Sequence, residues 1–306
     1  MSAKIAVVGS INMDLVFSTP RMPLPGETLM GHQFHQIHGG KGANQAVAAA
    51  RAGGSVALLA CVGNDVNGHS SLQALQSEGI DCQYVRNVDG MATGVAAILL
   101  DDLGQNSIVL AIGANALVSP VDVDSAQQML SKSQIMLCQL ETPLESVRHA
   151  VELAVRSGVQ VVLNPAPAQA LDDVLLAQVN YLVLNETEAS MLTDIRVIDV
   201  LSAAEAASAL QRRGVPVVIV TLGGEGIWVA DIGSAYSLPA FKVNVVDTTA
   251  AGDTFVGALS VALAEGQVLR QACLFAQAAA ACAVTKLGAQ TSIPNRSAIE
   301  RQLQNQ

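Results

Sequence analysis

The sequence predicts an α/β protein with a doubly wound, mostly parallel sheet flanked by helices. Short apolar runs alternate with longer helical stretches between residues 56 and 161, and this repeated β-α order is typical of a parallel sheet. Two patches, 15–38 and 93–112, instead have the pattern of short strands joined by turns and could assemble one small second sheet. With 51% hydrophobic residues in 306, the chain can bury a large core, or two smaller ones.

The elements can be expected in the following order. Strands are predicted at residues 4–9, 56–59, 135–140, 159–163, 179–184 and 217–221. Helices are predicted at residues 46–52, 70–78, 143–157, 258–265 and 271–284. The second small-strand patch contains a turn at 101–104, and a hairpin turn before residues 227–229 is one interpretation of the glycines there.

Composition excludes several classes of function. A net charge of −10 without a cluster of Lys or Arg argues against a nucleic-acid or anionic membrane partner. No window approaches the roughly 18 apolar residues of a membrane span and the N-terminus enters a strand, so we expect a cytoplasmic protein. The cysteines have no metal-ligand spacing and are interpreted as buried thiols: Cys61, Cys82, Cys138, Cys273 and Cys282. Alternating polar residues on a strand explain His32, His35 and His38 better than a zinc site does.

The segment 245–257 carries the strongest chemical signal. Its β-branched start, tight loop and Ala/Leu-rich continuation predict a strand, a turn and a helix N-terminus. Unpaired N–H groups of Ala250, Ala251 and Gly252 would attract phosphate oxygens there. A carboxylate beside an anion site, Asp253, is useful if it takes a proton from an attacking hydroxyl, which suggests phosphoryl transfer to an alcohol. The alternative is that Asp253 only caps the helix.

Polar residues also follow several other predicted strands, where open α/β sheets bind ligands. Asn12 and Asp14 could bond vicinal sugar hydroxyls or form an ordinary Asx turn. Glu141 could cap the helix after Pro143, and Asn185 with Glu188 could cap the next helix.

Two glycine-rich loops complete the pattern. The loop 39–45 opens a helix but lacks the Walker A spacing, so it is not a P-loop. Glycines there and at 223–226 let the backbone approach a compact ligand closely, although tight turns alone would explain them too.

The run Asp247-Thr-Thr-Ala-Ala-Gly-Asp253-Thr-Phe255 closely resembles the signature of the ribokinase-like (PfkB) carbohydrate kinases. The resemblance runs from Gly9-Ser-Ile-Asn-Met-Asp14 to Lys286-Leu-Gly-Ala-Gln290, which is nearly the whole chain. It implies one domain, 1–306, in which segments 13–38 and 93–112 form a β lid that also makes a homodimer. It further implies ATP-dependent phosphorylation of the 5-hydroxyl of D-ribose, with 2-deoxyribose, fructose or a nucleoside as alternatives. A sugar-binding regulator without catalytic activity is the non-enzyme alternative.

The same resemblance assigns roles to individual residues. Asp253 would be the general base, beside the backbone anion hole at 250–253. The sugar would be held by Asn12, Met13, Asp14, Gly40, Lys41, Gly42, Ala43, Asn44, Glu141 and Asp253. The nucleotide would be held by Asn185, Thr221, Leu222, Gly223, Gly224, Glu225, Gly226, Gly252, Asp253 and Gln277.

The resemblance also implies two cations. Glu188 would hold Mg²⁺, directly or through water, and hard oxygen ligands with retained waters suit that ion. A monovalent cation, K⁺ in most relatives, would lie among Asp247, Thr249, Ala283, Lys286, Gly288 and Ser292.

Overall fold

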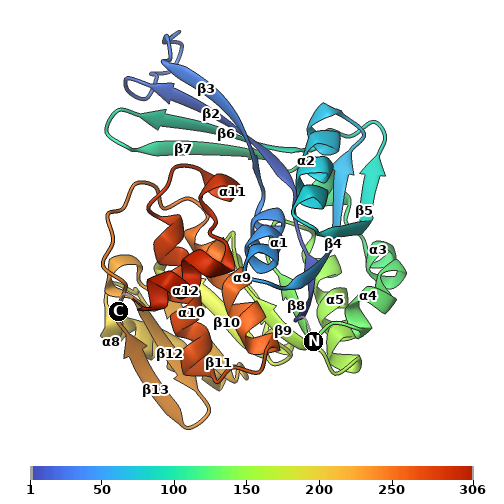
Figure 1. The fold of residues 1–306 in the computed structure, drawn as a ribbon, viewed down its shortest axis with the longest axis vertical. Coiled ribbons are helices and arrows are strands. Elements are labelled where there is room, and N and C mark those ends of the chain that lie inside the picture. The colour runs from blue at the N-terminus through green and yellow to red at the C-terminus, as the bar shows by residue number, and fades with distance from the viewer. Residues whose placement is uncertain (1–2, 305–306) are drawn as a thin grey trace.

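The computed structural model describes residues 3–304, which form a large and a small sheet (Figure 1). The large sheet has nine strands in the order β13-β12-β11-β10-β9-β8-β1-β4-β5, and the small sheet has four in the order β3-β2-β6-β7. The strands of the large sheet are β1 (Lys4–Val8), β4 (Ser55–Gly63), β5 (Asp81–Val88), β8 (Ile135–Cys138), β9 (Gln160–Leu163), β10 (Tyr181–Asn185), β11 (Val217–Thr221), β12 (Ile227–Asp231) and β13 (Ser234–Leu238). Those of the small sheet are β2 (Asn12–Thr19), β3 (Gln33–Gly39), β6 (Gly94–Asp101) and β7 (Asn106–Ala111).

The large sheet is parallel from β11 to β5, and only β12 and β13 add antiparallel pairs at one edge. Strand order reverses beside β1, which pairs with β4 on one side and β8 on the other. Such a reversal is the switch point at which ligands bind in doubly wound sheets. The predicted fold class is therefore confirmed.

Helices cover both faces of the large sheet. Their bounds are α1 (Lys41–Arg51), α2 (Val66–Ser77), α3 (Pro120–Ser125), α4 (Gln127–Ser131), α5 (Leu144–Arg156), α6 (Asp173–Leu176), α7 (Glu186–Thr193), α8 (Val200–Arg212), α9 (Ala251–Ala264), α10 (Leu269–Ala283), α11 (Ala289–Ser292) and α12 (Arg296–Gln304). Two short 3₁₀ turns lie at η1 (Gly113–Leu117) and η2 (Gly223–Glu225).

Each strand of the sheet contributes to two separate cores because side chains alternate across it. In β1, Ile5 and Val7 pack with α1, α9 and α10, whereas Ala6 and Val8 pack with α3, α5 and α8 on the other face. A core of small aliphatic side chains lets helices lie close to the strands, as the low aromatic content of 3% predicts.

The small sheet is built from two hairpins, β2-β3 and β6-β7, joined by parallel pairing of β2 with β6. The predicted turn at 101–104 is present, with the N–H of Gly104 donating to the carbonyl of Asp101. The small sheet projects at the top of Figure 1, above α1 and α11.

Several local predictions need correction. Residues 245–249 form no strand; Val245 and Val246 are more than 60% exposed and have no neighbouring strand to pair with. Residues 289–292, for which no helix was predicted, form the short helix α11, and α2 begins four residues before its predicted start. Cys82 and Cys282 are half-buried, whereas the other three cysteines are buried as predicted. In residues 3–304, no helix combines the length and apolar composition needed to cross a bilayer.

Candidate functional site

Two cavities lie side by side at the carboxyl ends of β10 and β11 and the start of α9. One, of about 250 Å³, is mostly apolar and includes Phe241, Phe255 and Gln277 in its wall. The other, of about 200 Å³, is lined by Lys41, Glu188 and Asp253 among others. Thr221, Thr248 and Gly252 belong to both walls. The arrangement provides an apolar compartment next to a charged one.

The start of α9 separates the two compartments. Ala250, the residue before the helix, has a φ of 58°, which is the left-handed region that a non-glycine residue rarely adopts. One expectation is wrong here: the N–H of Ala251 is not free but donates to the carbonyl of Thr248 at 3.2 Å. Gly252 and Asp253 lie in the first turn, where N–H groups have no acceptor within the helix.

Asp253 is buried, and both of its carboxylate oxygens accept hydrogen bonds from α1. The amide of Asn44 donates to Oδ2 and that of Gln45 donates to Oδ1, each at 3.0 Å. The two helices approach closely at Gly257, where a Cβ would lie 2.6 Å from the Cβ of Ala48. Sequence reasoning missed Gln45, because nothing in the glycine-rich loop indicates which helix its amide meets.

Asn12 and Asp14 lie on the same face of β2, as alternate residues must. Asn115, which sequence reasoning missed, donates to the Asn12 side chain at 2.8 Å and bonds the backbone of Ile11. Gly39 leaves room for the Asp14 carboxylate, since a Cβ there would lie 2.2 Å from Oδ2. The Met13 side chain points to the other face of β2, so the structure does not bring it to this group.

The carboxyl group of Asp14 is in an unfavourable environment for a charge. Burial and the nearby carboxylates of Glu141 and Asp253 raise its pKa from 3.8 to about 7. The carboxyl group of Asp14 therefore changes between its protonated and ionised forms near neutral pH.

Glu141 has a partner different from the one expected. It does not cap α5, which begins after Pro143 without a side-chain cap. Instead it accepts from the N–H of Lys41 at 3.0 Å and from the hydroxyl of Ser10, so it caps α1. Ala43 in that helix is part of the core through its side chain, and its N–H donates to the carbonyl of Ser10.

Lys41 carries the positive charge of the polar compartment. Burial by itself would lower its pKa, but the carboxylates of Asp253, Glu141 and Glu188 outweigh burial and raise it. The side chain therefore stays protonated at neutral pH and reduces the repulsion among these carboxylates.

Asn185 and Glu188 form a capping box at the start of α7, as the simpler interpretation predicted. The Asn185 side chain accepts from the N–H of Glu188 at 2.8 Å, and Glu188 accepts from the N–H of Asn185 at 2.9 Å. Glu188 also lines the charged compartment, and its burial raises its pKa. Capping thus fixes a carboxylate at the cavity wall.

The turn after β11 borders the apolar compartment through its glycines. Gly223, Gly224 and Gly226 line the cavity, whereas Leu222 is buried in the core and Glu225 is exposed. In the same wall, Gln277 donates to the carbonyls of Leu238 and Pro239 at 3.3 Å, while its Oε1 is buried and has no partner among residues 3–304. An open acceptor of this kind suits a ligand with an amino group.

The two loops expected to hold a monovalent cation lie together. The N–H of Val246 donates to the carbonyl of Val284 at 2.7 Å, and that of Gly288 donates to Oδ2 of Asp247 at 2.8 Å. Burial would raise the pKa of Asp247, but hydrogen bonds from Thr249 and Gly288 hold it below its ordinary value. The remaining residues of that set are the buried Ala283 and Ser292 and the exposed Lys286.

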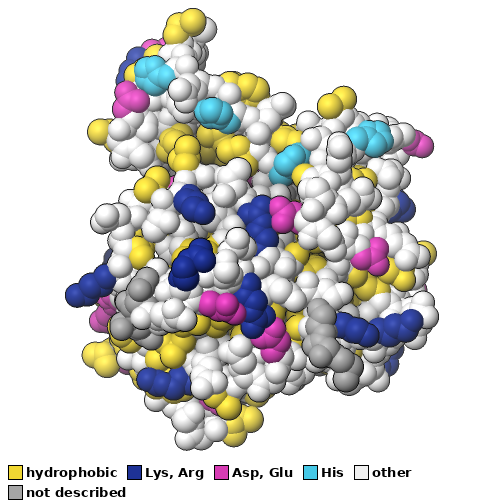
Figure 2. All heavy atoms as spheres, viewed as in Figure 1, with side chains coloured by type: hydrophobic (Ala, Val, Ile, Leu, Met, Phe, Trp, Pro, Cys, Tyr) yellow, Lys and Arg dark blue, Asp and Glu magenta, His cyan; other side chains and the backbone are white. Residues whose placement is uncertain are grey.

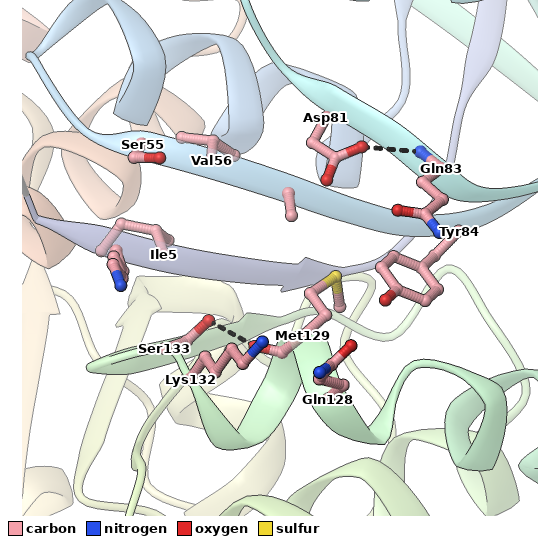
Figure 3. Close-up of a pocket in the computed structure, with 12 residues that line it drawn as sticks. Ile5, Ser55, Val56, Asp81, Gln83, Tyr84, Gln128, Met129, Lys132 and Ser133 are labelled. Carbon is pink, nitrogen blue, oxygen red and sulfur yellow. Dashed lines mark hydrogen bonds between the residues drawn. The ribbon is translucent and has the colours of Figure 1, made fainter.

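A further cavity of about 310 Å³ lies at the opposite edge of the sheet, where β1, β4 and β5 begin (Figure 3). Lys4, Asp81, Tyr84 and Lys132 are in its wall, and α4 forms one side. It contains neither a glycine-rich loop nor the start of a long helix, so we place the functional site at the carboxyl edge. Within residues 3–304, no three His, Cys, Asp or Glu side chains are grouped as a metal site.

Comparison with known proteins finds similar chains among sugar kinases. The chain is 46% identical over 296 residues to a ribokinase of Haemophilus influenzae, with 97% of each chain covered. It is 40% identical over 293 residues to a deoxyribokinase of Salmonella typhi, with 95% of each covered. Both similarities extend over the whole fold.

Solved structures give the same result. A ribokinase of Thermotoga maritima superimposes with a TM-score of 0.91 at 38% identity, covering 99% of this chain and 100% of that one. A ribokinase of Arabidopsis thaliana, solved with ribose and ATP, superimposes with a TM-score of 0.93 at 32% identity, covering 99% of both chains. The model of the pfkB family carbohydrate kinases matches residues 2–296. This chain is therefore a member of the pfkB family of carbohydrate kinases.

Proposed function

We propose that this chain transfers the terminal phosphoryl group of ATP to the 5-hydroxyl of D-ribose. The observation that carries the proposal is the position of Asp253: a buried carboxylate at the first turn of α9, between the polar face of β2 and two adjoining cavities. A ribokinase relative solved with ribose and ATP and the similarity to other ribokinases support the choice of substrates.

The sugar would lie against the small sheet. Asn12 and Asp14 present donors and acceptors for vicinal hydroxyls, and Asn115 fixes the Asn12 amide so that it need not be ordered on binding. Oδ1 of Asn44 is buried, has no partner in the described part of the chain and would accept from a further hydroxyl. The small sheet covers the sugar as a lid within a single domain.

In the reaction, Asp253 accepts the proton of the 5-hydroxyl while that oxygen attacks the terminal phosphorus and the bond to the bridging oxygen of ADP breaks. The N–H groups at the start of α9 and the ammonium group of Lys41 stabilise the negative charge of the transferring group. The adenine would occupy the apolar compartment, with Gln277 accepting from its amino group.

The described residues fit the two cations that the family implies. Glu188 is a single fixed carboxylate at the cavity wall, which suits Mg²⁺ held with retained waters and phosphate oxygens. Bound there, Mg²⁺ would neutralise charge on the triphosphate. Asp247 joins the two loops whose carbonyl groups would face K⁺, next to the anion site.

We expect ribose-dependent release of ADP that is faster with K⁺ than with Na⁺ as the only monovalent cation. The experiment compares ribose with 2-deoxyribose under both conditions, because a relative 40% identical to this chain is a deoxyribokinase. Faster turnover with 2-deoxyribose would keep the mechanism and change the substrate. No ADP release with any sugar would favour a sugar-binding regulator instead.

We also propose a homodimer formed by the outer face of the small sheet. The rings of Phe17 and Phe34 pack there with their centroids 4.8 Å apart. The side chains of Phe17, Phe34 and Val109 are between 40% and 72% exposed. Hydrophobic side chains gather over this sheet in Figure 2. An apolar face of this kind is commonly covered by a partner.

Light scattering should therefore give twice the chain mass of 31.6 kDa. Val109→Lys would place a charge on the outer face and should yield monomers. Val155→Lys, a change at an exposed valine of α5, is the matched control and should stay dimeric. A monomeric wild-type protein at micromolar concentration would contradict the dimer.

A further inference from the structure

We infer that Gln45 is a positioning residue for phosphoryl transfer, which holds the Asp253 carboxylate in one orientation through a buried chain of amides. The inference rests on the proposed role of Asp253 and adds the groups that act through it. Gln45 does not line either cavity, so it is not itself a ligand-binding residue.

Every polar atom of the Gln45 side chain has a partner. Its Nε2 donates to Oδ1 of Asp253 at 3.0 Å and to Oδ1 of Asn164 at 3.2 Å. Its Oε1 accepts from Nε2 of Gln139 at 2.6 Å. Gln45 and Gln139 are both completely buried, so water does not compete for these bonds.

The surroundings determine which way each amide faces. Nδ2 of Asn164 donates to the carbonyl of Val183 at 3.0 Å, so Oδ1 of Asn164 must face Gln45 as an acceptor. The two acceptors Asn164 and Asp253 require the amino group of Gln45, which leaves Oε1 for Gln139. Turning the Gln45 amide over would set its amino group against the donor Gln139 and its oxygen against two acceptors, so all three hydrogen bonds would be lost at once.

The backbone keeps this chain of amides in place. Oε1 of Gln139 is packed against Gly9, where a Cβ would lie only 2.2 Å away. Gly257 allows α1 and α9 to pack closely, because a Cβ at residue 257 would lie 2.7 Å from the Gln45 carbonyl oxygen. This close packing fixes the position of Gln45 relative to Asp253. The carboxylate is thus held from both sides, by Asn44 at one oxygen and by Gln45 at the other.

This orientation matters because proton transfer needs the carboxylate oxygen within hydrogen-bond reach of the reacting hydroxyl. If Gln45 were lost, the carboxylate could rotate about its own bonds without leaving the site. Such a change should affect the chemical step and leave ribose binding largely intact.

The test uses Gln45→Met, which keeps the length of the side chain but cannot form the three hydrogen bonds of the Gln45 amide. We expect kcat to fall on the order of 10–100-fold, as small misplacements of reacting groups do. KM for ribose and ATP, and the ribose Kd from calorimetry without nucleotide, should stay within about threefold. Gln211→Met, which removes the hydrogen bond from Gln211 on α8 to the carbonyl of Pro216, is the control and should leave kcat unchanged.

A double-mutant cycle separates positioning from a general packing role. If Gln45 acts through Asp253, adding Gln45→Met to Asp253→Asn should change the residual rate by less than about twofold. Equal losses in both backgrounds, or normal kcat in folded Gln45→Met, would overturn the inference.

Gln45→Glu provides a second route, since it keeps the acceptor for Gln139 but, when ionised, loses the donor to Asp253. We expect a similar loss of kcat and a lower thermal unfolding midpoint than that of the wild type, because the new carboxyl group is completely buried beside the Asp253 carboxylate. If neither variant folds, Gln45 is a core residue and the inference fails. Wild-type turnover in the same assay tests the proposed function by itself. The effect of Gln45→Met is measured relative to that wild-type rate, so the two outcomes can be told apart.

Discussion

Replacing Asp253 with alanine should lower ribose-dependent turnover by at least about 10²–10⁴-fold, the usual contribution of a general base. The carboxylate is buried at the first turn of α9, and three of the side chains beside it cannot act as a base. Asn44 and Gln45 are donors, whereas Lys41 is protonated at neutral pH. None of the three can accept the proton of the sugar hydroxyl.

Steady-state kinetics and ribose calorimetry together test this prediction. Ribose should still bind to Asp253→Ala, because Asn12 and Asp14 are unchanged, while the rate of ADP formation falls. A circular dichroism spectrum like that of the wild type would show that the fold is intact. Turnover near the wild-type rate in such a folded variant would remove Asp253 from the mechanism.

Asp14→Asn should have two opposite effects, with weaker ribose binding and greater stability above neutral pH. Above about pH 7, where Asp14 is ionised, its carboxylate makes stronger hydrogen bonds than an amide, so KM for ribose should rise by about 10–100-fold in the variant. Stability should increase because the variant no longer has to bury a charge between Glu141 and Asp253.

The pH dependence of this gain follows from the raised pKa of Asp14, about 7 when folded against 3.8 ordinarily. Between these values the unfolded chain has lost the proton and the folded chain retains it, so rising pH destabilises the wild type. The advantage of Asp14→Asn should be absent below about pH 3, grow to about pH 7 and then level off. Three pKa units set its upper limit at about 4 kcal/mol.

Urea denaturation of both proteins from pH 4 to pH 8 measures this difference. Asp194→Asn is the matched control, because Asp194 is exposed and its φ of 58° suits asparagine. The control should show no comparable pH-dependent gain. A constant difference between Asp14→Asn and the wild type at all pH values would contradict a raised pKa for Asp14.

The sequence was informative wherever function depends on strand ends and local spacing. Asn12 follows the apolar strand β1 and Asn185 ends the apolar strand β10, so their position at one edge of the sheet could be predicted. Glu188 was predicted either as a cap or near a ligand, and the structure shows a capping residue in a cavity wall.

The errors and omissions involve contacts between distant parts of the chain. Glu141 caps a helix 100 positions earlier in the sequence, and Asn115 bonds Asn12 across 103 positions. No local pattern encodes such pairs, because a single amide or carboxylate has many equivalent partners. The β-branched residues 245–246 were expected in a strand, but β-propensity has little effect where no strand is available for pairing.

Identification of the product tests the central claim most directly. Wild-type protein incubated with ribose, ATP, Mg²⁺ and K⁺ should yield ADP and ribose 5-phosphate in equal amounts, with the phosphorus coupled to the protons on carbon 5 in NMR spectra. Asp253→Ala should yield neither above background. Phosphate attached to another carbon of the sugar, or ADP with free phosphate and no sugar phosphate, would contradict the proposed geometry of transfer.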